Sequence, residues 1–379
     1  MVHSSPSKQD AGDPAAYPND DSALVLVPWL DIGGADQVAM DLIIAMHSAG
    51  MSVEVMTTQP SPDRRLEFVP PDVPVWRLPA LLPPGALPGA IVARAASTRP
   101  AVVHVLNSRI GLDITPALAS LTSGPRVVCH LLGEEGPGGG YPPYAVRRHR
   151  SSITAFVVVS DDLADVIAGY GADRSRTHVV RPRVDLERFQ PTNPPKADDG
   201  TLRVLLPARL ASEKRPLLAI AAIEEVIRRG TPATLTLTGD GPLRDTVLAA
   251  IATSPHSHAF AAPGIIDDMP KAYGDHDVVL LTSEFEATPL AIGEALASGV
   301  AVVAPRIGGI PELVGDCGVL VDDPTPANLA DAITHFADRD ARLRARSAGR
   351  ERAMKMLGPG ATTHRLLHIH RQVAAGAHA

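Results

Sequence analysis

Aromatic residues are scarce in this chain, at 3% of its 379 residues, and cysteine occurs only twice. Two cysteines cannot build a framework of several disulfides. Cys129 lies inside an apolar segment and Cys317 lies just before one. Buried thiols in a reducing compartment are therefore the expected state, and we predict a cytoplasmic protein.

Long apolar runs are also missing. The longest, such as residues 102–106 and 155–159, are far shorter than the roughly 20 residues that a membrane-spanning helix needs. Residues 1–21 are polar and have no apolar centre, so they predict a disordered tail and not a signal peptide. The net charge of −7 shows no excess of cations, which argues against a nucleic-acid partner.

What the chain does contain is a repeated order of short apolar runs and helical segments. The runs are continuous in Val, Leu and Ile, as is typical of parallel strands buried on both faces of a sheet. The predicted strands cover residues 23–28, 52–57, 102–106, 126–131, 155–160 and 178–181, and then 202–207, 234–238, 258–261, 277–283, 300–305 and 319–322.

A Pro-rich segment at residues 189–200 separates the two series of strands and indicates a linker. Each series predicts a Rossmann-like, doubly wound α/β domain, the first over residues 22–188 and the second over residues 201–358. A helix over residues 360–375 is expected to dock back on the first domain. Ligands of such domains bind at the carboxyl ends of the strands, so we expect the chemistry there.

The strongest candidate site follows the strand that ends at Ser283. Thr288 is expected to cap the next helix, whose free N–H groups, such as that of Leu290, suit an anion such as a diphosphate. Glu286 and Glu294 flank this helix start and suit recognition of hydroxyl groups on either side of the anion. The competing interpretation is that both carboxylates are ordinary surface groups.

A second candidate lies in the loop after the first strand of the second domain. Arg209 binds phosphate oxygens well because its guanidinium can donate two parallel hydrogen bonds, and Lys214 adds a point charge. Ser212 is expected to cap the helix that opens near Pro216. Solvated loop cations are the alternative.

The third candidate is the pair Gly33-Gly34 in the first loop of the first domain, where glycine permits close backbone approach to a ligand. A glycine pair alone is a weak signal. No G-x-G-x-x-G follows this strand, and residues 239–244 lack the third glycine. A nicotinamide or flavin enzyme is therefore disfavoured.

Taken together, these motifs resemble those of the retaining glycosyltransferases of family 4, which have the GT-B architecture of two Rossmann-like domains facing across a cleft. The resemblance extends from residue 23 to about residue 335. It rests on Gly33-Gly34, Arg209-Leu210 with Glu213-Lys214, Gly239–Pro242, Glu286 with Glu294, Gly299–Val303 and Gly308-Gly309-Ile-Pro-Glu312. The chain departs from the family in Ala208, in Glu286-Ala-Thr-Pro289 and in Arg181-Pro-Arg-Val-Asp185.

The resemblance implies a role for each matching residue of the second domain. Arg209 and Lys214 would bind the donor diphosphate and stabilise the leaving group. Glu294 would hold the ribose, and Glu286 would contact hydroxyls of the transferred sugar. In the first domain, Gly33 and Gly34 would lie near phosphate and sugar, and His130 would face the reacting sugar.

The predicted reaction is transfer of a sugar from a UDP- or GDP-sugar to an acceptor hydroxyl with retention. No Asp-x-Asp stands at a strand end, so we predict no metal and no other cofactor, with the leaving charge met by cations and the helix start. Two alternatives stay open, namely a nucleotide-sugar epimerase of the same architecture and a non-catalytic sugar-nucleotide-binding protein.

The acceptor cannot be read from the sequence. The first domain would bind it, and the choices are a small natural product such as an aminocyclitol, a glycolipid or a polysaccharide. Residues 70–99 predict a loop and a helix, and a peripheral membrane contact stays open there. High Ala, Arg and Pro content suggests a GC-rich bacterial source and natural-product biosynthesis.

Overall fold

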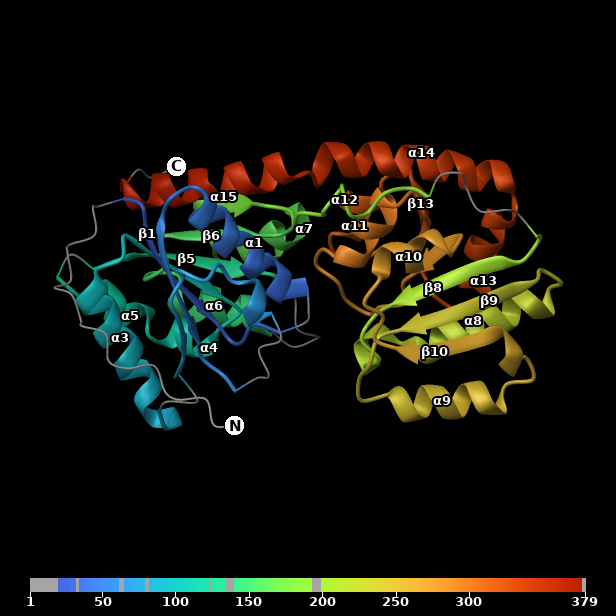
Figure 1. Ribbon diagram of the computed structural model, residues 1–379, viewed down its shortest axis with the longest axis horizontal. Helices are drawn as coiled ribbons and strands as arrows, with labels where there is room; N and C mark the ends of the chain where they lie inside the picture. Colours follow the sequence, from blue (N-terminus) through green and yellow to red (C-terminus); the bar gives the residue numbers. More distant parts are fainter. Residues whose placement is uncertain are drawn as a thin grey trace. The chain divides into compact units, whose positions relative to one another are not determined.

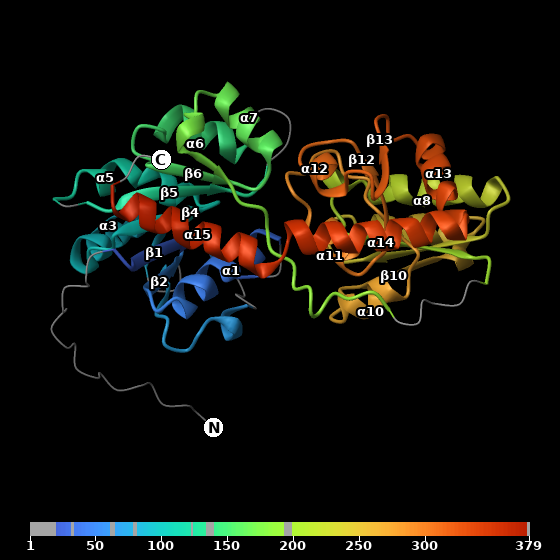
Figure 2. The same ribbon diagram turned by 90° about the horizontal axis from the view of Figure 1, so that it is seen from above.

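The structure is a computed structural model that describes residues 20–31, 34–60, 65–78, 82–122, 124–133, 140–192 and 199–376. It contains two parallel β-sheets with helices packed on them (Figures 1 and 2). The chain divides into two compact units. The first unit comprises Met1–His130, His149–Phe156 and Leu367–Ala379, and the second comprises Leu131–Arg148 and Val157–Leu366.

The first sheet has seven strands in the order β3-β2-β1-β4-β5-β6-β7. Its strands are β1 (Ser22–Val27), β2 (Ser52–Thr57), β3 (Val75–Arg77), β4 (Val102–Leu106), β5 (Arg126–Leu131), β6 (Ala155–Val158) and β7 (Thr177–Val179). The helices along this part of the chain are α1 (Gly34–Ser48), α3 (Leu87–Thr98), α4 (Arg109–Asp113), α5 (Thr115–Ala119), α6 (Tyr141–His149) and α7 (Asp161–Gly169).

The second sheet has six strands in the order β10-β9-β8-β11-β12-β13. Its strands are β8 (Leu202–Pro207), β9 (Ala233–Thr238), β10 (Phe260–Gly264), β11 (Val278–Leu280), β12 (Ala301–Pro305) and β13 (Gly318–Val321). The helices are α8 (Pro216–Arg228), α9 (Arg244–Thr253), α10 (Met269–Gly274), α11 (Leu290–Ala297), α12 (Ile310–Val314), α13 (Pro326–Thr334) and α14 (Arg339–Met356), followed by α15 (Pro359–Ala374). Figure 1 shows α9 beside β10, and Figure 2 shows α14 running past α11.

The central strands of both sheets are fully buried. All six residues of β1 and all five of β4 and β12 are buried, because helices cover parallel sheets on both faces. Local signals fix several helix starts. Ser160 accepts a hydrogen bond from the Leu163 N–H at the start of α7, and Thr325 does the same for the Asn328 N–H at the start of α13.

The prediction of two Rossmann-like, doubly wound parallel sheets is confirmed. Four strands have the predicted bounds, namely β2, β4, β5 and β8. Strand β3 lies in the loop part of the loop and helix predicted over residues 70–99. It was missed because two half-buried residues and the exposed Arg77 at a sheet edge give no apolar run. The strand predicted at residues 258–261 begins at Phe260, after a 3-10 turn over Ser257–Ala259.

Candidate functional site

The strand order of the second sheet changes direction at one point, between β8 and β11. Connections run outward in opposite directions from β8 and β11, which are hydrogen-bonded neighbours. The loops that leave the carboxyl ends of two such strands diverge and open a crevice. The candidate residues Arg209 and Lys214 follow β8, and Glu286 follows β11.

These two loops are joined by hydrogen bonds. The Glu284 N–H donates to the Glu213 carbonyl (2.8 Å), and the Thr282 hydroxyl donates to the Lys214 carbonyl (2.7 Å). The Arg215 Nε–H donates a hydrogen bond to the Thr282 carbonyl (2.6 Å). Backbone and side chain together therefore hold Lys214 against the loop of the neighbouring strand.

Lys214 and Glu286 meet directly. Lys214 Nζ lies 2.6 Å from Glu286 Oε1, and the Ser283 hydroxyl donates to the same carboxylate oxygen at 2.7 Å. Both side chains are largely shielded, with exposed fractions of 24% and 12%. An ion pair that is this well shielded holds the lysine and the carboxylate together at the carboxyl edge of the sheet.

Arg209 is placed differently. Its guanidinium lies 2.5 Å from Glu213 Oε1, and its side chain is 64% exposed. The loop that carries it is fixed by the glycine-containing turn after β9, because the Leu210 N–H donates to the Asp240 carbonyl (3.0 Å). Ser212 does not cap α8, contrary to expectation. It begins a short 3-10 turn. Helix α8 starts after Arg215, which has a φ of 47° and makes no side-chain cap hydrogen bond.

The helix start after β11 also differs from the prediction. Thr288 does not cap α11; its hydroxyl donates to the carbonyl of Val159 (2.8 Å), and Pro289 occupies the cap position. The N–H of Leu290 lies in the first turn, where no preceding helical carbonyl can accept it. The helix start therefore keeps its capacity for an anion without the predicted cap.

Glu294 projects from the middle of α11 toward a residue that sequence reasoning missed. The hydroxyl of the fully buried Tyr273 lies 2.8 Å from Glu294 Oε2. Burial, and then the Glu294 carboxylate, raises the pKa of Tyr273 well above its ordinary value, so the phenol stays a hydrogen-bond donor. Tyr273 stands in α10, outside every motif, and no local signal marks it.

The Gly308-Gly309 motif supports the Glu286 loop. Gly308 has φ of +50°, and a Cβ atom there would lie 1.7 Å from the Glu286 carbonyl oxygen. Gly309 donates its N–H to the carbonyl of Ala287 at 2.7 Å. The backbone after β12 thus packs directly on the backbone that carries Glu286, and any side chain at residue 308 would displace it.

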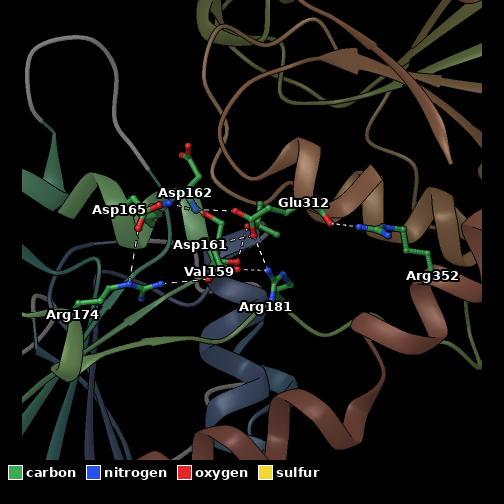
Figure 3. A network of polar contacts seen from close by, with 11 residues as sticks. Val159, Asp161, Asp162, Asp165, Arg174, Arg181, Glu312 and Arg352 are labelled. Atoms are coloured by element: carbon green, nitrogen blue, oxygen red, sulfur yellow. Dashed lines mark hydrogen bonds and ion pairs between the residues drawn. The ribbon is translucent and has the colours of Figure 1, made fainter. Parts of the chain in front are cut away.

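A polar network in the second unit surrounds Glu312, the last residue of the same motif (Figure 3). Its carboxylate accepts the N–H groups of Asp161 (3.0 Å) and Asp162 (2.8 Å), the first two residues of α7. Arg181 lies 2.7 Å from both Glu312 and Asp161. Glu312 therefore acts as a second cap for α7, and Arg181, one of the residues at which the chain departs from the family pattern, balances its charge.

The first unit carries the remaining candidates. Gly33 lies outside the described residues, and Gly34 begins α1. Two residues on, burial raises the pKa of Asp36 to about 6. His130 lies near the end of β5 with a fully buried ring, and burial lowers its pKa to about 3. This imidazole is neutral at physiological pH.

In the part of the chain that the structure describes, no group of three or more His, Cys, Asp or Glu side chains is arranged to hold a metal ion. Within the same residues, no helix is both long and apolar enough to span a bilayer. Metal independence itself stays a prediction.

Comparison with known sequences gives matches along most of the chain. Residues 32–188 match Glycosyltransferase Family 4, and residues 201–339 match Glycosyl transferases group 1. The D-inositol 3-phosphate glycosyltransferase of Pseudarthrobacter chlorophenolicus is 27% identical over 368 residues, 84% of this chain and 87% of that protein. That of Thermomonospora curvata is 30% identical over 242 residues, 56% of this chain and 55% of that protein. This chain thus spans about half the length of several curated relatives that it matches.

Solved structures of low identity show the fold. A glycosyltransferase from Rickettsia africae has a TM-score of 0.78 at 17% identity, covering 93% of this chain and 99% of that one. HepE of Anabaena in complex with UDP has a TM-score of 0.76 at 20% identity, covering 94% and 99%. The two sheets are those of the GT-B fold. With both halves matched, the chain belongs to the group 1, family 4 glycosyltransferases.

Proposed function

We propose that this protein transfers a sugar from a nucleoside diphosphate sugar to an acceptor hydroxyl. The observation that carries the proposal is the Lys214–Glu286 pair, which stands where β8 and β11 diverge. In this proposal a phosphate of the donor replaces Glu286 as the partner of Lys214. The carboxylate of Glu286 is then free to accept hydrogen bonds from sugar hydroxyls. UDP is the nucleotide of choice, because the Anabaena structures similar to this chain are complexes with UDP and UDP-glucose.

The proposed chemistry needs no proton donor on the leaving group. The acceptor oxygen attacks the anomeric carbon on the face from which the diphosphate leaves, the bond from that carbon to the phosphate oxygen breaks, and the departing oxygen takes the acceptor proton. This course retains configuration. Lys214, Arg209 and the start of α11 would stabilise the charge that develops on the diphosphate. No metal enters this scheme.

The acceptor proposal rests on the relatives' names. Several are D-inositol 3-phosphate glycosyltransferases, and one is a putative colanic acid biosynthesis glycosyltransferase. We propose a cyclitol-type small molecule first, with a glycolipid or polysaccharide end as the next choices. The first domain would bind it, and the reaction would take place in the cytoplasm.

Turnover with a panel of donors and acceptors tests the proposal. UDP-glucose, UDP-N-acetylglucosamine and GDP-mannose are each incubated with and without inositol 3-phosphate, and nucleotide release and product mass are measured. A transferase gives a glycosylated acceptor. Conversion of a donor sugar without any acceptor would identify an epimerase, and binding without turnover of any kind would identify a non-catalytic protein.

A further inference from the structure

Three buried histidines of the first unit form a chain of hydrogen bonds. His104 Nδ1 lies 2.9 Å from His130 Nε2, and His104 Nε2 lies 3.0 Å from His370 Nδ1. His370 Nε2 in turn lies 3.0 Å from the carbonyl oxygen of Asp20. All three side chains are buried, with exposed fractions of 0% to 1%.

Burial keeps each ring neutral. It lowers the pKa of His130 to about 3 and, with the neighbouring imidazoles, lowers that of His104 well below its ordinary range. Burial also lowers the pKa of His370. A neutral imidazole has one N–H donor and one acceptor nitrogen, so the three rings can share their protons in only two ordered ways.

The Asp20 carbonyl selects one of them. A carbonyl oxygen only accepts, so His370 must carry its proton on Nε2 and its Nδ1 must accept. His104 then donates from Nε2 and accepts at Nδ1, which requires the proton of His130 to be on Nε2. The reverse order would point a ring lone pair at the Asp20 oxygen and would leave an N–H on His130 Nδ1 that no described residue accepts.

With the protons in this order, the Nδ1 atom of His130, at the end of the chain away from Asp20, is an acceptor. His130 Nδ1 is buried and has no hydrogen-bond partner among the described residues. The same holds for Asn107 Oδ1, one residue beyond β4, and the strand register pairs Leu106 with His130. Two buried acceptors, each without a donor among the described residues, therefore stand at the carboxyl ends of neighbouring strands, where a doubly wound sheet binds its ligand. Unpaired buried acceptors are costly, and a polyhydroxyl ligand supplies the missing donors.

We propose that His104 and His370 are positioning residues that hold His130 in the Nε2–H tautomer, so that its Nδ1 accepts a hydrogen bond from a hydroxyl of the sugar substrate. The role of the sugar rests on the proposed function, whereas the tautomer does not. Because His130 is fully buried, binding must also move the atoms that cover Nδ1. A sugar without that hydroxyl leaves the acceptor unpaired, so the chain favours a hydroxylated sugar over its deoxy analogue.

The test uses nitrogen NMR of the full-length protein labelled at histidine, with the His130 signals identified by their loss in His130→Asn. Expected for the free wild type is a neutral His130 protonated on Nε2. His370→Asn keeps an oxygen that can accept from His104 and should preserve this tautomer. His370→Leu removes the acceptor and should give a mixture of the two tautomers.

Activity is measured on the same variants as the rate of UDP release from UDP-glucose, with thermal melting as a check on folding. We expect His370→Leu to lower kcat in proportion to the fraction of His130 that leaves the Nε2–H tautomer, about twofold for an even mixture, and His370→Asn to recover most of the loss. His258→Gln, at an exposed histidine of the second unit, should change neither the tautomer nor the rate.

Three results would decide against parts of the account. A wild-type His130 protonated on Nδ1 overturns the proposal without reference to any substrate. Equal rates for a folded His370→Leu and His370→Asn would overturn the positioning role. The expected tautomers with no turnover of any nucleotide sugar would overturn the proposed function and, with it, the role given to the sugar hydroxyl.

Discussion

Lys214 Nζ lies 2.6 Å from Glu286 Oε1, although the two residues are 72 positions apart and follow different strands. The pair forms because β8 and β11 are neighbours whose carboxyl ends meet at the same edge of the sheet. In the second unit, a cation of a type that suits phosphate, Lys214, therefore lies beside a carboxylate of a type that suits hydroxyl groups, Glu286.

Gly308→Ala tests the packing beneath Glu286. The added Cβ would meet the Glu286 carbonyl oxygen at 1.7 Å, and a backbone atom cannot move aside without taking the loop with it. We expect loss of most transferase activity. Gly230→Ala is the matched control, because Gly230 also has a positive φ of +93° but has nothing within 4 Å of the added atom.

Both substitutions place alanine in a left-handed conformation, which costs about 1–2 kcal/mol. Only the residue 308 variant should therefore lose activity beyond its loss of stability. Similar activity in the two variants, measured well below their melting temperatures, would contradict the proposed support.

Tyr273→Phe tests how Glu294 is oriented. The substitution removes the hydroxyl that lies 2.8 Å from the Glu294 carboxylate, and loss of one such bond costs about 1 kcal/mol. If Glu294 holds the donor ribose, KM for the donor should rise several-fold with a smaller change in kcat. Tyr170→Phe, at the end of α7, serves as the control. An unchanged KM in Tyr273→Phe would remove the positioning role.

Glu312→Ala tests the network of Figure 3. The variant removes an acceptor of two N–H groups at the start of α7. It leaves Asp161 as the one ion-pair partner of Arg181 among the described residues. We expect a loss of about 1 kcal/mol in the free energy of unfolding, as for loss of a helix cap. The exposed Glu187 provides the control, since Glu187→Ala should leave the melting temperature unchanged. Equal melting temperatures for the two variants would mean that the network contributes nothing.

Stability should depend on pH through the three buried histidines. Their pKa values are lowered in the folded state, so the unfolded chain binds more protons once the pH falls below about 6.5. The free energy of unfolding should then fall with falling pH, by up to about 1.4 kcal/mol per pH unit for each histidine. Urea unfolding at pH 7.5, 6.5 and 5.5 measures this slope. His370→Asn removes one titrating group and should reduce the slope; an unreduced slope would exclude this origin.

Sequence alone predicts the parts of this structure that depend on local pattern. The continuous Val and Leu runs predict both ends of β4 and of β8 correctly. Caps were harder. Thr288 was expected to cap its own helix, yet its hydroxyl bonds to the carbonyl of Val159, 129 positions earlier. A hydroxyl has several partners to choose from, and only the folded chain decides among them.

Residues that support the site through distant contacts could not be predicted at all. Tyr273 reaches Glu294 from another helix, and His370 reaches His104 across 266 positions. Neither belongs to a motif, because their roles depend on which helix packs where and not on spacing. The motif residues Arg209, Lys214, Glu286 and Glu294 carry family signatures and could be named in advance, but their binding roles stay predictions.

The central claim is that Lys214 binds the phosphates of a nucleotide sugar. Calorimetric titration of UDP-glucose into wild type, Lys214→Ala and Lys271→Ala tests it most directly. Lys271 also pairs with a carboxylate, that of Asp275, and serves as the control on an exposed helix face. The account predicts equal affinity for wild type and Lys271→Ala, and at least a tenfold weaker affinity for Lys214→Ala, as expected for loss of a charge-assisted contact. Undiminished binding by a folded Lys214→Ala protein would contradict it.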